Sequence, residues 1–574
     1  MPHIPTVVGI NRTQDGSVAV ARGRAEVVSL QKERLTRRKH HWGRLGDLPN
    51  LYLPALAVLR EPVDLVVECF SSDDEIKHIE AYHDEVRATL GFAEHGGRDE
   101  PRIVTMSHHL SHLYSAFPPS PFPTAAVMVI DGQGSPVRDL TEPCDLGEET
   151  PPDLLEVASF YRCERGRPVE CLAKQLWYGD WDRPAGLGCF YYLLTRLMFT
   201  GEGSEGKAMG LAPFGTVGTF GLPDLVVDGH QVLIPPEWLD VFARRDRFRY
   251  FLDGTGSFQQ CADLAAEGQR VFETALLRVT AWLHEQTGLD DLCFAGGTAL
   301  NCSANGRILR ESPFREVFVP PSAHDGGTAL GCALYGMLEV LGAPSDFRWT
   351  DDFLGPQTDA AAVEVAVRTA ATDPTLVVER PGDDATLANR VAELLDTGHV
   401  VAVHQGRSES GPRALGNRSI LADARHPGMQ DFINFRVKGR EWFRPLAPLV
   451  LAEYASTIFD VDRPAPFMQL AVDVRPEHRH ALPAITHVDG TARIQTVERV
   501  HTPFLHALLA AFEARTGCPV LLNTSLNGKG DPLTETPADS LACLTATEMH
   551  ALVLAPYLIR KRDTVAVPGA GHPL

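Results

Sequence analysis

The chain has 574 residues, too many for one ordinary hydrophobic core, so we expect two large domains or several smaller ones. Its composition, 44% hydrophobic and 22% charged, is typical of a soluble globular protein, and no apolar run approaches the roughly 18 residues that cross a bilayer. The net charge of −21 argues against a broad nucleic-acid-binding surface, because such a surface neutralises phosphates through many Lys and Arg contacts.

Short apolar runs rich in β-branched residues open the chain, and turn residues bound each of them, so we predict strands there. These runs cover residues 6–10, 17–20, 63–69 and 125–130. Helical periodicity dominates 262–288, and a strand at 292–295 leads through a glycine pair into a helix-like segment. Strands that alternate with helices predict an α/β fold with a mainly parallel sheet.

Residues 342–359 are rich in turn residues and lack periodicity, so we place a boundary there and predict domains over residues 1–350 and 351–574. A second α/β series follows, and the sequence contains no tandem repeat. Its predicted elements are a helix near 385–397, a strand at 399–404, a helix at about 502–516 and a strand at 518–523.

Eleven cysteines form no Cys-x-x-Cys pair, which argues against a zinc ribbon and a disulfide framework. The first residues lack the basic segment and apolar segment of a secretory signal. We therefore expect reduced thiols and a cytoplasmic location.

The segment GRSESGPRALGNRS, residues 406–419, places Arg407, Arg413 and Arg418 around a Gly-Pro turn. Residues 407–444 hold eight Lys or Arg and four Asp or Glu, a local net charge of +4 within a chain of −21. Guanidinium groups match phosphate oxygens, so this island predicts a site for a small polyanion. The alternative is a solvated loop whose arginines pair with its own acids.

A metal site is suggested by SHHLSH, residues 107–112, in which Ser107 is a plausible helix N-cap. His108 and His112 are four residues apart and would share one helix face, the spacing that offers two ligands to one metal. His109 lies about 100° round the helix and is less suited as a ligand. Surface histidines are the alternative reading of this pair.

Two acids could complete a ligand set. Asp131 ends the apolar run 125–130, and Asp325 follows the strand predicted at 316–320. Acids at the carboxyl ends of parallel strands lie where α/β sheets build their sites, although an Asp-Gly turn is the alternative for both. A set of two His and two Asp suits iron(II), zinc or manganese.

Two glycine-rich segments suggest nucleotide contacts. FAGGTALNCSAN, 294–305, would expose main-chain N–H groups at Gly296 and Gly297 and carries Asn301 at the start of a helix. GEGSEGKAMGLAPFG, 201–215, is predicted to be a loop around Lys207. Neither matches a Walker or dinucleotide fingerprint, and packing is the alternative for both.

Further cations and amides follow the arginine-rich loop. Lys438, Arg440 and Arg444 lie in RVKGREWFRPLAP, and Arg493 lies in ARIQTV. At the end of the apolar strand 518–523, the chain then delivers Asn523, Thr524 and Ser525. Hydroxyls and an amide at that place could bind a nucleotide or a carbamoyl group.

Taken in order along the chain, these segments resemble the O-carbamoyltransferases of antibiotic and nodulation-factor biosynthesis, and the resemblance covers almost the whole sequence. Aminoglycoside carbamoyltransferases of the nebramycin type are similar in length and layout, and GPRALGNRS is nearly diagnostic. The matching segments are VVGIN…DGSVAV, KERLTRRKHH, SHHLSH, VMVIDGQG, GEGSEGKAMGLAPFG, FAGGTALNCSAN, FVPPSAHDGGTALG, GRSESGPRALGNRSILADAR, VKGREWFRPLAP and LLNTSLNGKGDP.

The resemblance implies an N-terminal duplicated α/β domain of the actin-like ATPase type (Kae1-like) and a C-terminal YrdC-like α/β domain. The YrdC-like domain would form carbamoyl-adenylate from carbamoyl phosphate and ATP with Mg²⁺. The Kae1-like domain would carry a divalent metal, most simply iron(II), and move the carbamoyl group to a hydroxyl of an antibiotic or a similar secondary metabolite.

The resemblance also assigns residues. The metal ligands would be His108, His112, Asp131 and Asp325, and Lys207, Gly296, Gly297 and Asn301 would contact the adenylate. Carbamoyl phosphate and ATP would bind Arg413, Arg418, Lys438, Arg444, Arg493, Asn523 and Ser525, of which Arg413, Lys438 and Arg444 would act in catalysis.

One departure affects the base of the transfer step. The N-terminal motif of the family commonly carries His-Asp, whereas this chain has Gln14-Asp15. Gln cannot accept a proton as a base, so Asp15 is our candidate, with a supporting role at the site as the alternative.

Other functions stay open at this point. Related domains transfer a threonylcarbamoyl group to tRNA, which the charge of −21 disfavours, and an actin-like scaffold could also serve a non-enzymatic nucleotide-binding regulator. The acceptor is open among aminoglycosides, macrolides and ansamycins. We expect small-molecule partners, no nucleic acid and no membrane, with a homodimer as an open possibility.

Overall fold

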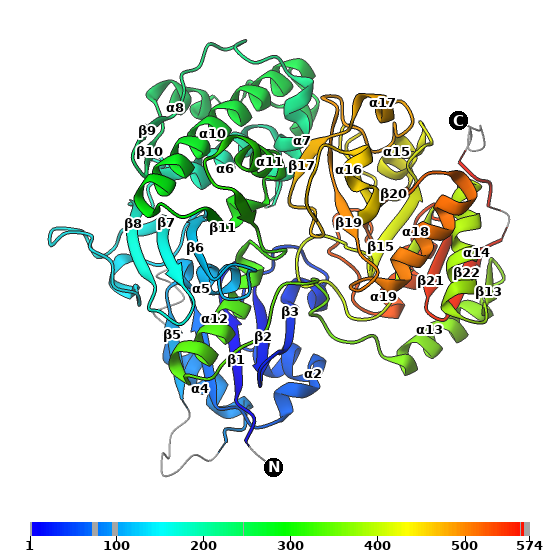
Figure 1. Cartoon of the computed structure of the whole chain (residues 1–574), viewed down its shortest axis with the longest axis horizontal. Helices are drawn as coiled ribbons and strands as arrows, with labels where there is room; N and C mark the ends of the chain where they lie inside the picture. Colours follow the sequence, from blue (N-terminus) through cyan, green and yellow to red (C-terminus); the bar gives the residue numbers. More distant parts are fainter. Residues whose placement is uncertain are drawn as a thin grey trace. The chain divides into compact units, whose positions relative to one another are not determined.

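The computed structural model describes residues 3–71, 79–93, 102–201, 203–244, 246–562 and 564–567. It divides into two compact units (Figure 1). Unit 1 comprises Met1–Thr36 and His40–Trp349, and unit 2 comprises Arg37–Lys39 and Thr350–Leu574. The change of unit after Trp349 falls inside the turn-rich segment 342–359. None of the helices in the described ranges combines the length and the apolar character needed to cross a membrane.

Unit 1 contains two five-stranded sheets that repeat one topology. Their orders are β3-β2-β1-β4-β5 and β12-β11-β6-β7-β8. In each sheet the first three strands form an antiparallel meander, the fourth pairs in parallel with the first, and the fifth pairs in parallel with the fourth. The strands are β1 Thr6–Asn11, β2 Ser17–Arg22, β3 Glu26–Gln31, β4 Leu65–Cys69, β5 Ile103–Met106, β6 Thr124–Ile130, β7 Leu155–Glu164, β8 Glu170–Trp177, β11 Asp291–Ala295 and β12 Glu316–Phe318.

The α/β fold class predicted from the sequence is confirmed, but the prediction of a mainly parallel sheet is wrong. Only five residues separate β1 from β2, which is too few for the crossover that a parallel pair requires, so the two strands form a hairpin. The repeat of topology has no counterpart as a repeat in the sequence.

Two short helices connect these sheets. α5, His108–Ala116, and α12, Thr328–Tyr335, pack against each other, and α12 also covers β1. A Cβ at Gly331 would lie 1.8 Å from the carbonyl oxygen of Ser111, and one at Gly9 would lie 1.9 Å from that of Ala329. Glycine at position 331 therefore permits the close approach of α12 to α5, and glycine at position 9 permits that of β1 to α12.

The remaining long helix of unit 1 is α10, Phe258–Thr287, which covers the predicted helix at 262–288. Its N-cap is Ser257, whose side chain accepts a hydrogen bond from the Gln260 N–H. Its C-cap is Gly288, which has φ 63°. Both ends therefore carry ordinary helix-capping chemistry.

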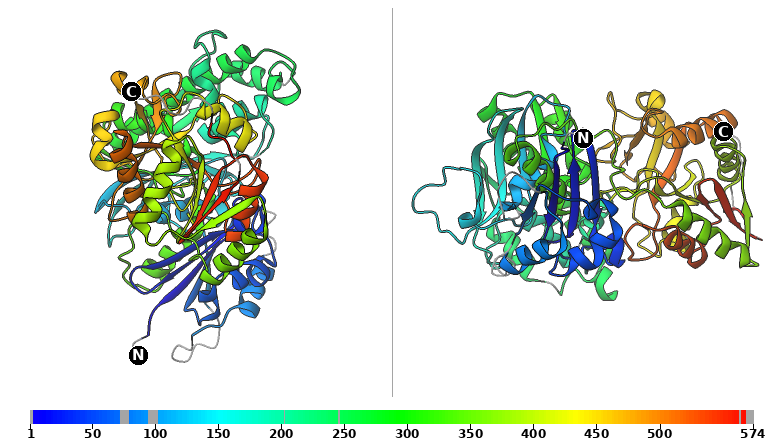
Figure 2. Two further views of the ribbon diagram at one scale, coloured as in Figure 1. Left: turned by 90° about the vertical axis from the view of Figure 1, so that its right-hand side faces the viewer. Right: turned by 90° about the horizontal axis from the view of Figure 1, so that it is seen from below.

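Unit 2 is built on an eight-stranded mixed sheet in the order β13-β22-β21-β14-β15-β20-β16-β19. The helices α14 and α18 pack against each other, as do α13 and α19 (Figures 1 and 2). The strands are β13 Leu376–Glu379, β14 Val401–His404, β15 Arg418–Asp423, β16 Ala447–Leu451, β19 Gln495–Val497, β20 Val520–Ser525, β21 Ala551–Leu554 and β22 Tyr557–Lys561. The helices are α13 Ala360–Thr372, α14 Asp384–Asp396, α18 Pro503–Thr516 and α19 Pro537–Ala546, and β17 Ala471–Asp473 pairs with β18 Thr491–Arg493 outside the large sheet.

Candidate functional site

The four predicted metal ligands of unit 1 lie together. His108 and His112 stand one turn apart on α5, Asp131 follows β6, and Asp325 opens the short turn of helix before α12. One ligand atom from each lies within 4.8 Å of all the others. Both acids follow strands of one sheet, β6 and β12, whereas both histidines stand on α5, which follows β5 of the other sheet, so the cluster lies where the two sheets of unit 1 meet.

The distances within the cluster fit a bound cation. The two Nε2 atoms are 3.2 Å apart, His108 Nε2 is 3.3 Å from Asp131 Oδ2, and His112 Nε2 is 3.5 Å from Asp325 Oδ1. Metal–ligand bonds of about 2.0–2.2 Å place neighbouring donors roughly 3.0–3.5 Å apart. Two nitrogen and two oxygen donors, mostly buried, therefore form a set that suits a first-row divalent metal.

The electrostatics of the cluster are those of opposite charges held together. Burial acts to lower the pKa of His108, but the carboxylates of Asp325 and Asp131 outweigh it and raise that pKa well above its usual value. Burial likewise acts to raise the pKa of Asp131, yet the two imidazoles hold it well below its usual range. The site thus favours positive charge among its carboxylates.

A buried ion network holds the start of α5. Lys174 Nζ donates to Glu142 Oε1 and to Glu156 Oε2, both at 2.7 Å, and Glu156 Oε1 accepts the His109 N–H at 2.9 Å. We expected the Ser107 side chain to cap α5, but it donates to Glu142 instead. His109 belongs to this network and not to the ligand cluster.

Asp15 lies beside the ligand cluster and is paired with a histidine that our sequence analysis did not single out. Asp15 Oδ1 is 2.9 Å from Nδ1 of His40. The Asn11 amide donates to the carbonyl oxygens of Asp15 and Asp325, at 3.2 and 2.9 Å, and so ties the Asp15 turn to a predicted metal ligand. The only sequence signal for His40 is its place in KERLTRRKHH, because 25 residues separate it from Asp15.

The glycine-rich segment before α11, Cys302–Glu311, is arranged differently from our prediction. The N–H of Gly297 donates to Asp131 Oδ1 at 2.8 Å, so in this structure it orients a predicted metal ligand. Gly296 has φ 90°, and a Cβ there would lie 2.2 Å from the carbonyl oxygen of Ile130. Asn301 caps α11 by accepting the Ala304 N–H at 3.1 Å. These contacts give the three residues structural roles that the sequence analysis had not assigned.

Lys207 lies on a helix and not in the predicted loop. α7 covers Glu205–Leu211, and the Lys207 ammonium stands 5.5 Å from the centre of the Phe199 ring. Its side chain is half-buried.

In unit 2 the loop between β14 and β15 holds the GPRALGNRS motif, and a buried acid organises it. Glu409 Oε1 accepts the N–H groups of Leu415 and Asn417 at 2.8 and 2.9 Å. The alternative of a solvated loop does not hold, because Glu409 is only 1% exposed. These main-chain amides are therefore occupied by the protein's own carboxylate.

Arg418 and Arg407 are framework residues in this structure. Arg418 is 0% exposed and donates to the carbonyl oxygens of Gln405 and Asn417 at 2.7 and 2.9 Å. Arg407 donates to the carbonyl oxygens of Gly355 and Leu354. The predicted role of Arg418 in anion binding is thus replaced by main-chain support, since its donors face carbonyls. Arg413 is half-buried in the same loop.

The remaining predicted cations of unit 2 form a repulsive group. Burial lowers the pKa of Arg440 well below its usual value, and the neighbouring Arg444 and Arg493 lower it further. Burial and then Arg440 lower the pKa of Lys438 in the same way. An acid, Glu441, lies beside the group, with its Oε2 3.7 Å from Arg444 Nη1. We name Lys438, Arg440, Arg444 and Arg493 the cation cluster; Arg440 was not among our predicted binding residues.

Ser525 and Asn523 lie near the end of β20. Lys438 Nζ donates to the carbonyl and hydroxyl oxygens of Ser525 at 2.6 and 3.0 Å. The Asn523 amide donates to Ala414 O at 3.0 Å and Gln495 Oε1 at 2.8 Å, and its own oxygen is buried without a hydrogen-bond partner among the described residues. A buried acceptor without a donor beside such a cluster is compatible with a polar ligand.

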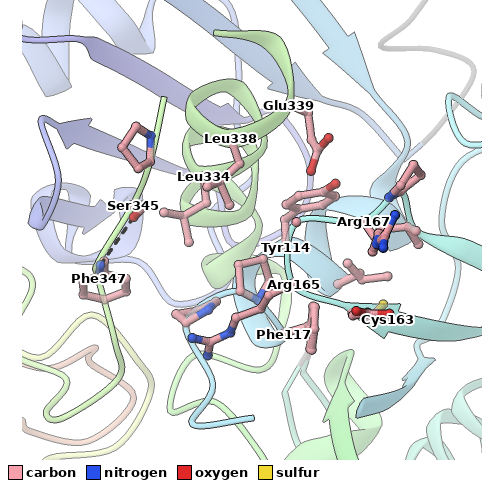
Figure 3. A pocket seen from close by; sticks show the side chains of 18 of the residues that line it. Tyr114, Phe117, Cys163, Arg165, Arg167, Leu334, Leu338, Glu339, Ser345 and Phe347 are labelled. Carbon is pink, nitrogen blue, oxygen red and sulfur yellow. Dashed lines mark hydrogen bonds between the residues drawn. The ribbon is translucent and has the colours of Figure 1, made fainter. Parts of the chain in front are cut away.

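A cavity of about 510 Å³ lies on the other face of α5 (Figure 3). Leu113 and Phe117 line it from the helix side opposite His108 and His112. Arg165, Arg167 and Glu339 add charge to a mostly apolar lining (Figure 3). The helix therefore separates this cavity from the metal-ligand cluster, and the cavity is not a part of it.

Comparison with known families identifies both parts of the chain. The model described as "Carbamoyltransferase N-terminus" matches residues 80–334, and "Carbamoyltransferase C-terminus" matches residues 392–561. The first match contains all four predicted metal ligands, and the second contains the GPRALGNRS loop and the cation cluster.

Similar proteins extend over most of the chain. A protein of Synechocystis described as "Uncharacterized protein sll1178" is 32% identical over 95% of this chain and 95% of its own length. "Nodulation protein NolNO" of Sinorhizobium fredii is 36% identical over 81% of this chain and 65% of its own length. "3'-hydroxymethylcephem-O-carbamoyltransferase" of Streptomyces clavuligerus is 29% identical over 97% of this chain and 99% of its own length.

Proposed function

This chain belongs to the carbamoyltransferase family and is a transferase, and from that premise we propose the reaction that its two units carry out. Unit 2 combines carbamoyl phosphate with ATP and forms carbamoyl-adenylate, releasing phosphate and pyrophosphate. Unit 1 moves the carbamoyl group from the adenylate to a hydroxyl of a small acceptor and releases AMP. The domain assignments of residues 1–350 and 351–574 follow from this division.

The cation cluster supports the first half-reaction. Carbamoyl phosphate and ATP are both anions, so their reaction requires positive charge that screens their repulsion. Arg440 and Arg444 are half-buried and close enough to repel each other, and Glu441 is an acid beside Arg444 that offsets part of this repulsion. Such a group is unfavourable until an anion binds, and phosphate oxygens match its guanidinium donors. We assign Lys438, Arg440, Arg444 and Arg493 to this site, with Arg413 as a further candidate and Mg²⁺ accompanying ATP.

Asn523 and Ser525 would orient the carbamoyl group in unit 2. Asn523 offers a buried amide oxygen to the carbamoyl N–H groups, and Ser525 fixes the Lys438 ammonium. An oxygen acceptor in a buried place distinguishes a carbamoyl group from a bare phosphate, because only the former donates hydrogen bonds. We do not assign Arg418 to this site, since carbonyl oxygens occupy its donors.

The ligand cluster of unit 1 supports the second half-reaction. His108, His112, Asp131 and Asp325 would hold iron(II), zinc or manganese, and such an ion, when bound, supplies positive charge toward the phosphate of the leaving AMP. The Gly297 N–H keeps Asp131 in place, and the network of Lys174 holds the start of α5. The convergence of these four donor atoms within 4.8 Å is the observation that carries the proposal.

The acceptor is proposed to be a hydroxylated natural product. The similar cephem enzyme is named for O-carbamoyl transfer to a hydroxymethylcephem, and a second relative is named for nodulation. A small hydroxylated acceptor also agrees with the net charge of −21, which disfavours a nucleic-acid acceptor.

The decisive experiment supplies the protein with carbamoyl phosphate, ATP, Mg²⁺ and iron(II), and follows pyrophosphate and AMP separately. A panel containing a hydroxymethylcephem, an aminoglycoside, a macrolide and a chito-oligosaccharide is analysed for carbamoylated products by mass spectrometry. We expect pyrophosphate release to depend on carbamoyl phosphate. Pyrophosphate release without that dependence would reject carbamoyl-adenylate, and the absence of any turnover would favour a nucleotide-binding regulator.

A further inference from the structure

The pair formed by Asp15 and His40 combines short contact, burial and unusual backbone geometry. Asp15 Oδ1 and His40 Nδ1 are 2.9 Å apart, and the side chains are 8% and 24% exposed. Both residues have a positive φ, 54° for Asp15 and 52° for His40. Only four non-glycine residues in the described parts of the chain have a positive φ, so it is unusual that two of them face each other. Backbone strain of this kind concentrates at functional sites.

The surrounding main chain is built to hold this pair. Gly16 and Gly43 let the two segments approach each other, because a Cβ at Gly16 would lie 2.6 Å from the Gly43 nitrogen. The Gly16 N–H donates to His41 O at 3.0 Å, and the Gly43 N–H donates to Thr13 O at 2.9 Å. The turn that carries Asp15 and the segment that carries His40 are therefore locked together on both sides of the pair.

The other ring nitrogen of His40 also has a specific environment. The main chain at Gly203 packs against it, because a Cβ there would lie 1.9 Å from His40 Nε2, so only glycine allows this close approach. The second oxygen of Asp15 is 3.9 Å from Nε2 of His324, which is beyond hydrogen-bond distance. His40 is thus the histidine that Asp15 orients, and it is the more exposed of the two.

The pair also borders the predicted metal ligands within unit 1. Thr13 Oγ1 donates to Asp325 Oδ2 at 3.3 Å, and Asn11 links the main chain of Asp15 to that of Asp325. One short turn therefore carries contacts both to the ligand cluster and to the imidazole.

We propose that His40 is the general base of the carbamoyl-transfer step and that Asp15 is its positioning residue, an inference that rests on the proposed function. A carboxylate on Nδ1–H fixes the tautomer in which Nε2 accepts a proton. The acceptor O–H gives its proton to Nε2, and its oxygen forms a bond to the carbamoyl carbon. The bond from that carbon to the AMP phosphate oxygen breaks, AMP leaves with the electron pair, and the imidazolium returns its proton to solvent. His40 thereby supplies the base that Gln14 cannot.

The test uses the full chain loaded with iron(II), with glycerol as the probe alcohol. Carbamoyl-phosphate-dependent exchange of pyrophosphate into ATP reports on unit 2, while AMP release and carbamoylated glycerol report on unit 1. His40→Asn keeps a side chain that tolerates positive φ and can still donate to Asp15. We expect it to lower AMP release and glycerol carbamoylation roughly 10²- to 10⁴-fold, and to leave exchange and bound iron unchanged.

Two further variants separate the base from a structural role. In His40→Gly, added imidazole should restore AMP release in proportion to its concentration, because glycine accepts the backbone and leaves space for the ring. His41→Asn is the matched control, since the His41 ring bonds Thr36 Oγ1 at 2.7 Å and lies outside the pair, and it should behave as wild type. Asp15→Asn should lose part of the transfer rate and show no response to imidazole.

The possible failures are distinguishable. Wild-type AMP release in His40→Asn, or no response to imidazole in folded and iron-loaded His40→Gly, would overturn the assignment of the base. If the His40 variants lose both bound iron and AMP release, His40 supports the metal site, and the assignment of the base would also be overturned. If the wild type exchanges pyrophosphate but never releases AMP, the proposed transfer step itself is wrong.

Discussion

In unit 1 two imidazoles face two carboxylates, whereas in unit 2 four cations gather and Glu441 lies 3.7 Å from one of them, Arg444. The first arrangement lowers its own electrostatic energy, which is why the carboxylates raise the pKa of His108 despite its burial. The second raises its own energy, which is why the pKa of Arg440 is lowered by burial and by its neighbours. The carboxylates of the attractive cluster can bind a cation, whereas the repulsion within the cation cluster is relieved when an anion binds.

Removal of a ligand from the attractive cluster should have the largest effect. His112→Ala leaves three donors for the metal, so we expect loss of bound iron and of AMP release. A bound cation supplies several kcal/mol to such a step, which corresponds to roughly 10³-fold in rate. Exchange of pyrophosphate into ATP should continue unchanged. Elemental analysis and the two product assays decide this, and iron retained at the wild-type level would contradict the ligand set.

Removal of one charge from the repulsive cluster should weaken activity without weakening the fold. Arg440→Gln keeps a donor for Asn434 Oδ1, which accepts from Arg440 Nε at 2.8 Å, but it removes the positive charge. We expect carbamoyl-phosphate-dependent exchange to fall roughly 10²- to 10³-fold, as for the loss of one preorganised electrostatic contact. AMP release from supplied carbamoyl-adenylate should persist.

The same variant tests the sign of the electrostatic energy. Because Arg440 is repelled by Arg444 and Arg493, the ligand-free Arg440→Gln protein should unfold at the same denaturant concentration as wild type or at a higher one. A clear loss of stability in the absence of ligand would show that the cluster is held by attractive contacts, and the contrast between the units would fail.

Local patterns in the sequence were sufficient to predict the four residues of the ligand cluster, because each of them is marked by its immediate neighbours in the chain. His108 and His112 are four residues apart, and Asp131 and Asp325 each follow a recognisable apolar strand. His40 was missed because its contact with Asp15 depends on two glycine approaches between separate segments. The repeat of topology in unit 1 was expected only from the resemblance, which implied a duplicated domain, since strand order can repeat without repeated residues.

The arginines of unit 2 show what local sequence patterns could not predict. Residue type and spacing placed both Arg413 and Arg418 in one predicted anion site, but the direction of a guanidinium depends on the whole loop. Arg418 turns toward carbonyl oxygens of the β14–β15 connection, which itself wraps around Glu409. The sequence revealed a concentration of charge and could not reveal which charges support the chain.

Arg418 should therefore matter for folding more than for binding. The planar guanidinium of Arg418 donates to three carbonyl oxygens and one hydroxyl. A lysine ammonium cannot reach all four acceptors, so Arg418→Lys leaves buried carbonyl oxygens without a donor. We expect the free energy of unfolding to fall by about 1–3 kcal/mol. Arg413→Lys, in the same loop, is the matched control and should lower exchange with little change in stability. Equal stability of the two variants in urea unfolding would argue against the framework role.

The smallest expected effect is the stabilisation of the repulsive cluster by a simple anion. Pyrophosphate at ten times its Kd should stabilise the protein by about 1.4 kcal/mol through binding to the folded state. That gain should shrink as NaCl rises, since salt screens the partly exposed charges, and it should shrink further in Arg440→Gln. The metal-ligand cluster should instead be stabilised by iron(II) and not by pyrophosphate. His112→Ala should abolish the stabilisation by iron(II) and leave the stabilisation by pyrophosphate unchanged. A shift of the melting temperature by pyrophosphate that is equal in wild type and Arg440→Gln would place the anion outside the cation cluster.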